Sequence, residues 1–120
     1  MKKSILVAAQ VLTSIILVCV ETSANAGILG LANVKVASIS IQSVAGSNAA
    51  MKGVAYLHVT GGVLASPCSG LWVDSTDKLM QATLVSAKKS DKVMNIAYDN
   101  QAASPWGDNS WCRLDTVELL

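Results

Sequence analysis

The chain has 120 residues, of which 52% are hydrophobic and 14% are charged, and its formal net charge is +1. This length suits one small domain. Because the chain has no surplus of basic residues, its composition argues against a protein that binds the phosphate backbone of a nucleic acid or an anionic membrane surface.

Residues 1–26 have the pattern of a secretory signal peptide. Lys2 and Lys3 precede an apolar stretch, Ile5–Val20, and the segment ends in the small-residue pattern "ANA", which is typical of a cleavage site. The alternative is an uncleaved membrane anchor, for which this apolar stretch is slightly short. We therefore predict cleavage after Ala26. A single domain over residues 27–120 would then be periplasmic or secreted, as for bacterial export, and free of the membrane.

The cysteines predict one disulfide bond. Of the three cysteines, Cys19 would leave with the signal peptide, so that Cys68 and Cys112 remain as an even pair in an exported chain. The alternative is that Cys68 is a nucleophile paired with His58, the single histidine of the chain. The oxidising compartment and the matching partner both favour the disulfide.

The first strand of the exported domain is expected to be bent. In "NVKVASISIQSV", residues 33–44, Val34 and Val36 lie on one face of an alternating pattern, whereas Ile39 and Ile41 lie on the other. A regular strand cannot bury both pairs against one core. An extra residue near Ala37–Ser38 would restore the alternation, so we predict a β-bulge or a sharp bend there.

The second predicted strand covers residues 54–62, after a connection over 45–53. Ala55, Leu57 and Val59 share one face of this strand, while Tyr56 and His58 share the other. We therefore expect His58 to be half exposed or hydrogen-bonded at a sheet surface. A role as a metal ligand is disfavoured, because no second histidine or cysteine lies at metal-binding spacing.

A single amphipathic helix is predicted over Thr76–Lys89. It follows a cluster of residues that favour the helix N-cap, Asp74–Asp77. Met80, Leu84 and Ala87 recur at helical spacing, with Leu79 beside them, and indicate the face that packs on the core.

Further short strands are expected at 68–73, 92–99 and 112–120. The element order is then β-β-β-α-β-β, a mainly β domain with one helix. This order matches an OB-like small barrel of five strands, in which closure removes most exposed sheet edges. The alternative is an α+β fold in which the helix packs on an open antiparallel sheet.

The loop between the last two strands carries the candidate binding residues. The stretch "YDNQAASPWGDNSW", residues 98–111, combines aromatic rings with amides and carboxylates. Such a combination suits sugars, because ring faces pack on C–H groups and polar side chains bind hydroxyls. The alternative is structural: the polar residues form turns and the tryptophans cover the disulfide. The candidate ligand contacts are Trp106, Trp111, Asp108, Asn109 and Asn100.

The segments "PCSGLWVD", "DKLMQATLVSAKKSDKV" and "PWGDNSWCRLDTVEL" give the chain a family resemblance over Cys68–Leu120. In these segments it resembles small exported bacterial proteins of unknown function, a group distantly similar to the receptor-binding B subunits of subtilase-type AB5 toxins. The resemblance implies an OB fold, ring-forming homo-oligomers and glycan recognition. It assigns no sugar-binding residue, and it does not extend to residues 27–67.

Three functions are compatible with these patterns. The first is an exported, disulfide-bonded interaction domain that binds a glycan or a protein receptor. The second is a stand-alone periplasmic structural or inhibitor-like protein without a small-molecule site. The third, a small hydrolase, would need paired carboxylates such as Asp74 with Asp77 or Asp108 with Asp115. Capping and turn formation explain the same residues. The sequence carries no common catalytic motif, and no metal or cofactor is predicted.

The signal-peptide interpretation predicts the N-terminus of the exported protein. Protein recovered from the periplasm or the medium is expected to begin at Gly27, which intact-mass measurement and N-terminal sequencing can establish. A full-length protein that remained stably inserted in membranes would instead support the anchor interpretation.

Overall fold

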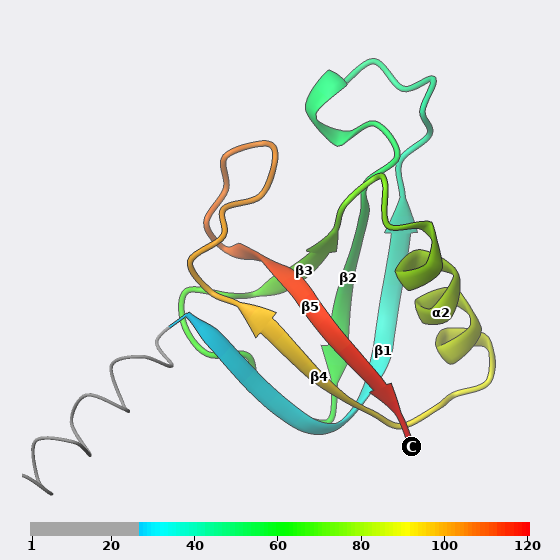
Figure 1. Cartoon of the computed structure of the whole chain (residues 1–120), viewed down its shortest axis with the longest axis vertical. Coiled ribbons are helices and arrows are strands. Elements are labelled where there is room, and N and C mark those ends of the chain that lie inside the picture. The colour runs from blue at the N-terminus through cyan, green and yellow to red at the C-terminus, as the bar shows by residue number, and fades with distance from the viewer. Residues whose placement is uncertain (1–26) are drawn as a thin grey trace, which may run out of the picture.

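The computed structural model describes residues 27–120, and the predicted signal segment, residues 1–26, lies outside the described residues. The described part consists of five strands, one α-helix and a short 3-10 helix (Figure 1). In chain order these are β1 (Ile28–Ile41), η1 (Ala49–Met51), β2 (Ala55–Thr60), β3 (Gly70–Val73), α2 (Lys78–Lys89), β4 (Met94–Asp99) and β5 (Trp111–Leu119).

The strands form a closed barrel in the order β1-β2-β3-β5-β4. Neighbouring strands are antiparallel, except that β3 and β5 run parallel. The prediction of a mainly β domain with one helix between the third and fourth strands is confirmed, and the five strands close into a small barrel. An open antiparallel sheet is wrong as an alternative, because β1 pairs with both β2 and β4 and the sheet closes on itself.

The first strand is bent where its apolar residues move from one face of the strand to the other. A register shift lies between Val36 and Ser38, which confirms the predicted bulge. A second irregularity, between Leu31 and Val34, includes Asn33 with a positive φ of 58°. These two bends let the first half of β1 pair with β4 and the second half with β2, which is how one strand serves two sides of the barrel.

The first strand is also longer than the sequence predicted. It begins at Ile28 and not at Asn33, and its early residues pair with β4 from Ile28 opposite Asp99 to Leu31 opposite Ile96. Leu29 and Leu31 are half-buried and pack against the core. Two apolar residues, Leu29 and Leu31, are too short a pattern to predict a strand. The segment is a strand because it pairs with β4.

The core fills the interior of the barrel, and the buried face of α2 packs on it. In β4 the side chains of Met94, Ile96 and Tyr98 are buried, as their predicted shared face requires. The buried Tyr98 hydroxyl accepts a hydrogen bond of 2.8 Å from the backbone N–H of Ala65. The phenol therefore ties the β2–β3 loop to the interior of the barrel.

The helix begins two residues later than predicted, because Asp77 is its N-cap. The Asp77 carboxylate accepts a hydrogen bond from the N–H of Met80. Leu84 and Ala87 are buried and Met80 is half-buried, as expected, but Leu79 is 80% exposed.

Gln81 takes a buried position on α2 that the apolar pattern did not indicate. Its side-chain amide donates hydrogen bonds to the carbonyl oxygens of Gly53, at 2.8 Å, and Asp74, at 3.1 Å. These bonds satisfy a buried polar group and join the helix to the connections before β2 and after β3.

The predicted disulfide between Cys68 and Cys112 is present, with a sequence separation of 44 residues. Both cysteines are buried in the core. Cys112 lies within the parallel pair of β3 and β5, opposite Leu71, and Cys68 lies just before β3. The bond therefore reinforces the place where the barrel closes.

Replacement of both cysteines by alanine is expected to lower the free energy of unfolding by about 4 kcal/mol, the chain-entropy value for a loop of this length. Urea unfolding followed by circular dichroism measures the change, with the reduced wild-type protein as the comparison. An unfolding midpoint equal to that of the oxidised wild type would show that the bond contributes nothing to stability.

Candidate functional site

The candidate site starts from the outer face of β2. Leu57 is buried in the core, so its neighbours Tyr56 and His58 point outward, as the alternation predicted. Tyr56 is half-buried and His58 is exposed. Opposite them on β3 are Trp72, which pairs with Tyr56, and Gly70, which lies one step beyond the Leu57–Leu71 pair.

Two tryptophans join these residues from the other side of the barrel closure. Trp111 is the first residue of β5 and lies opposite Gly70 in the parallel pair. Its ring centroid is 5.6 Å from that of Tyr56 and 5.1 Å from that of His58. Trp106 is 6.0 Å from Trp111 and 6.4 Å from Tyr56. We call these four residues the aromatic cluster.

The rings of Tyr56, Trp106 and Trp111 meet edge to face. The planes of Tyr56 and Trp111 are inclined at 84°, and those of Trp106 and Trp111 at 62°. Such T-shaped pairs are favourable, because the positive edge of one ring meets the negative face of the next. Trp111 contacts all three other members and is thus the centre of the cluster, while Trp106 lies at its rim.

Gly70 makes room for Trp111. A Cβ atom at this position would lie only 2.4 to 2.9 Å from three carbons of the Trp111 six-membered ring. The indole therefore lies directly over the backbone of β3. Cys112, the next residue along β5, is buried in the core on the opposite face. Trp111 consequently does not cover the disulfide. The structural alternative, in which the tryptophans of the loop cover the disulfide, therefore does not apply to this residue.

Trp106 is carried by a tight turn. The N–H of Gly107 donates a hydrogen bond of 2.9 Å to the carbonyl oxygen of Ser104, which closes a β-turn with Pro105 and Trp106 at its centre. Proline suits the first central position of such a turn and glycine suits its last. Gly107 has a positive φ of 85°, a conformation that glycine adopts without strain.

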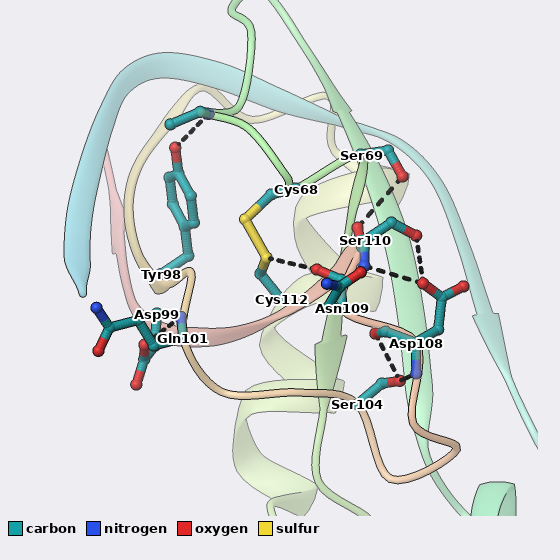
Figure 2. Close-up of a disulfide and its surroundings, with 11 residues drawn as sticks. Cys68, Ser69, Tyr98, Asp99, Gln101, Ser104, Asp108, Asn109, Ser110 and Cys112 are labelled. Carbon is teal, nitrogen blue, oxygen red and sulfur yellow. Dashed lines mark hydrogen bonds between the residues drawn. A yellow bond between two sulfur atoms is a disulfide. The ribbon is translucent and has the colours of Figure 1, made fainter.

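The loop that holds this turn is internally bonded. The buried Ser104 hydroxyl donates to the carbonyl oxygen of Asp108 and accepts from its N–H, at 2.9 and 3.0 Å (Figure 2). The Asp108 carboxylate accepts bonds from the hydroxyl and the N–H of Ser110, at 2.7 and 2.9 Å. The carbonyl oxygen of Ser110 in turn accepts from the N–H of Ser69 at 2.7 Å. Trp106 and Trp111 are therefore fixed to the β2–β3 connection.

Asp108 is held ionised by these bonds. The Ser110 hydroxyl and then its N–H stabilise the carboxylate and lower the pKa of Asp108 below its ordinary value. A depressed pKa in the folded state contributes stability above the unfolded-state pKa, and that stability is lost as the pH falls through the folded-state pKa. At neutral pH the ionised carboxylate thus stabilises the loop, and one of its oxygens accepts both hydrogen bonds from Ser110.

The remaining candidate residues are the two asparagines of the loop. Asn109 is exposed between Asp108 and Ser110. Asn100 lies at the opposite end of the loop, where its N–H donates a 2.8 Å bond to the carbonyl oxygen of Gly27. Its side-chain carbonyl oxygen is buried without a hydrogen-bond partner among the described residues. The structure thus gathers Trp106 and Trp111, with Asp108 in the adjoining turn, and separates Asn100 from them.

His58 and the paired carboxylates have structural partners. The Nδ1 atom of His58 lies 3.2 Å from the carbonyl oxygen of Ser69; because a carbonyl can only accept, this nitrogen is the donor in that bond. Asp74 accepts from the N–H and the hydroxyl of Thr76, and Asp77 caps the helix. Asp115 accepts from the hydroxyl of Thr116.

Two absences apply to the described part of the chain. In residues 27–120 no group of three or more histidine, cysteine or acidic side chains is arranged to hold a metal ion. Over the same residues, no helix has the length and apolar character needed to cross a membrane.

Comparison with known protein families, with curated proteins and with solved structures gives no significant match for this chain. Sequence reasoning placed Tyr56 and His58 on an outer strand face and the tryptophans in a distant loop, but did not join them. The signal that links them is Gly70, a residue without a side chain opposite a large aromatic one.

The contact between Gly70 and Trp111 predicts a sharp stability effect. Gly70→Ala is expected to lower the free energy of unfolding by about 1–3 kcal/mol, because the new methyl group overlaps the indole ring. Urea unfolding followed by tryptophan fluorescence measures it. Gly30→Ala is the matched control, since a Cβ there meets nothing closer than 3.8 Å. Equal effects of the two substitutions would contradict the packing of Trp111 over β3.

The titration of Asp108 provides a second check on the loop. Its pKa, measured by NMR of the side-chain carboxyl, is expected below the ordinary 3.8. Ser110→Ala should raise it toward that value, because the hydroxyl bond is the largest cause of the shift. An unchanged titration in Ser110→Ala would show that the hydroxyl does not bind the carboxylate.

Proposed function

We propose that this protein is an exported, disulfide-bonded binding domain whose aromatic cluster packs against a saccharide ring. The observation that carries the proposal is the gathering of Tyr56, Trp106 and Trp111 on the outer face of the barrel, with His58 beside them. None of the three is needed to fill the barrel interior, since the core consists of other side chains.

The place of the cluster in the barrel supports binding. OB barrels bind oligosaccharides and oligonucleotides on the face of strands 2 and 3, together with the loops between strands 1 and 2 and strands 4 and 5. Tyr56 and His58 belong to β2, Trp111 packs over β3, and Trp106 belongs to the β4–β5 loop. The exposed imidazole of His58 and the hydroxyl of Tyr56 supply polar groups beside the ring faces.

The charges favour a saccharide over a nucleic acid. Binding of a single-stranded nucleic acid combines stacking with a positively charged groove along the backbone. Asp108 is ionised in the turn next to Trp106, and Arg113, which follows on β5, lies 3.4 Å from the carboxylate of Asp99. A neutral sugar ring needs no such groove and uses the aromatic face for its C–H groups.

Export is the part of the proposal that the disulfide supports. A buried structural disulfide is typical of proteins that fold in the periplasm or outside the cell. Residues 1–26 have the composition of a signal peptide. A periplasmic or secreted location would also bring the domain into contact with cell-wall or surface glycans.

Glycan binding tests the proposal directly. On a glycan array the protein is expected to bind a saccharide, and Trp106→Ala should weaken that binding at least fivefold, which corresponds to about 1 kcal/mol. Trp106→Phe should retain part of the affinity, because it keeps an aromatic face. Titration calorimetry with the best array ligand measures the affinities.

Leu79→Ala is the matched control, since Leu79 is an exposed apolar residue on α2, away from the cluster. Its affinity should equal that of the wild type. If no glycan on the array binds the protein, or if Trp106→Ala leaves the binding unchanged, the saccharide proposal is overturned. A folded protein that binds no glycan would favour the second function, a structural or inhibitor-like protein in which the aromatic cluster contacts another protein.

A further inference from the structure

Gly27, which directly precedes β1, lies against the end of β4 and the loop that follows it. Its carbonyl oxygen accepts a 2.8 Å hydrogen bond from the N–H of Asn100, and the next residue, Ile28, pairs with Asp99. Gly27 is itself buried. In Figure 2 the side chains of Asp99 and Gln101 lie beside the start of β1. The backbone of Gly27 is therefore fixed next to these two side chains.

Two side-chain oxygens face Gly27. A Cβ atom built on this residue would lie 3.3 Å from Oε1 of Gln101 and 3.8 Å from Oδ1 of Asp99. The backbone nitrogen is two bonds away from that Cβ position, so both oxygens lie within about 6 Å of the nitrogen. Any other residue would fill the space between the backbone and these oxygens, which glycine leaves open.

The carboxylate of Asp99 is largely buried and weakly paired. Its side chain is 18% exposed, whereas that of Arg113, its ion-pair partner, is 45% exposed and lies 3.4 Å from the Oδ2 atom. Strong bonds between a cation and a carboxylate are shorter, about 2.7–2.9 Å. The Oδ1 atom, on the side of Gly27, accepts a 2.9 Å bond from the N–H of Gln101. A carboxylate so shielded from water is stabilised by a further cation.

Asn100 adds an unsatisfied acceptor to the same turn. Its side-chain carbonyl oxygen is buried and has no hydrogen-bond partner among the described residues, although buried polar groups are normally bonded. Asp99, Asn100 and Gln101 thus supply three consecutive side-chain oxygens beside the start of β1. The local environment favours a donor with a positive charge.

Cleavage of the signal peptide would create such a donor. In the hydrolysis of the Ala26–Gly27 peptide bond by a signal peptidase, the oxygen of water joins the carbonyl carbon of Ala26, which becomes a carboxylate. The two protons of water join the nitrogen of Gly27, which becomes an ammonium group. An uncharged amide with one N–H is replaced by a cation with three, and charge-assisted bonds are about twice as strong as neutral ones.

We propose that the ammonium group of Gly27, released by cleavage after Ala26, binds the carboxylate of Asp99 and the side-chain carbonyl oxygen of Gln101. The inference rests on the export part of the proposed function and not on saccharide binding. Cleavage then completes the fold, because it ties the start of β1 to the base of the β4–β5 loop, which carries Trp106. The exported protein is therefore more stable than any form in which this amine is blocked or displaced.

The test starts from protein that begins at Gly27, prepared from a fusion whose protease leaves no added residue. Selective acetylation of the α-amine removes its charge and should raise the equilibrium constant of unfolding about fivefold, as measured by urea unfolding. Retention of Ala26 keeps a charged amine but moves it by one residue, about 3.8 Å, and should cost a similar amount. Hydrogen exchange at the N–H of Asn100, which bonds to Gly27, should be faster in both altered forms.

Two variants identify the partner of the amine. In Asp99→Asn, acetylation should leave the stability unchanged, because the carboxylate that the ammonium binds is gone. In Arg113→Gln, the matched control, acetylation should keep its full effect, since only the other cation of Asp99 is removed.

The pH dependence of the wild type needs no variant. An ammonium bound in the folded state stabilises it below the pH at which the α-amine of the unfolded chain titrates, about 8, and this stabilisation is lost as the folded amine deprotonates. The difference in stability between the free and the acetylated protein should therefore be full at pH 6 and absent by about pH 10. Asp99 and Arg113, the charged groups beside the amine, keep their charges over that range.

Equal stability of the free and acetylated proteins would overturn the proposal, as would an equal loss on acetylation in Asp99→Asn. A protein that retains Ala26 and is as stable as the one that begins at Gly27 would also overturn it. An exported protein that begins at another residue would overturn this inference as well, without bearing on saccharide binding, which the glycan array tests separately.

Discussion

The parallel pairing of β3 with β5 is the contact on which the rest of this structure depends. It joins Gly70–Trp72 to Trp111–Arg113 through three residue pairs, and it closes the barrel. Without it, both strands would present unpaired edges to solvent, which favours aggregation. So short a pairing contributes few hydrogen bonds, and the Cys68–Cys112 bond holds the two segments together where they begin.

This pairing also has two faces with different uses. Side chains alternate along each strand, so Leu71 and Cys112 enter the core while Gly70 and Trp111 lie outside. The same three pairs therefore complete the hydrophobic interior and the centre of the aromatic cluster. Fold stability and the candidate binding surface share one set of backbone contacts, which explains why a glycine is suited to a buried position of β3.

The sequence predicted those features that depend on neighbours in the chain. The helix predicted over Thr76–Lys89, which begins at Lys78, the bulge before Ser38 and the shared face of Met94, Ile96 and Tyr98 all follow from local periodicity. The disulfide followed from a count of cysteines. In contrast, the start of β1 at Ile28 depends on pairing with β4, and the burial of Gln81 depends on two carbonyl groups brought to it by other segments. Local patterns contain no information of that kind.

The aromatic cluster is also a feature that depends on distant segments and not on a local pattern. Tyr56 and Trp111 are 55 positions apart in the sequence, and they meet only because β3 pairs with β2 on one edge and with β5 on the other. The sequence could identify the tryptophans as candidate contacts, but not the direction in which their rings face.

Rigidity is the property that this arrangement gives to the surface. Trp111 is fixed by the backbone of β3 beneath it, and Trp106 by a proline-containing turn bonded through Ser104 and Asp108. A ligand that packs on these rings meets side chains that are already ordered, so less conformational entropy is lost on binding. A small interface of two or three rings is otherwise weak, so an ordered surface of this kind would favour the saccharide binding proposed above.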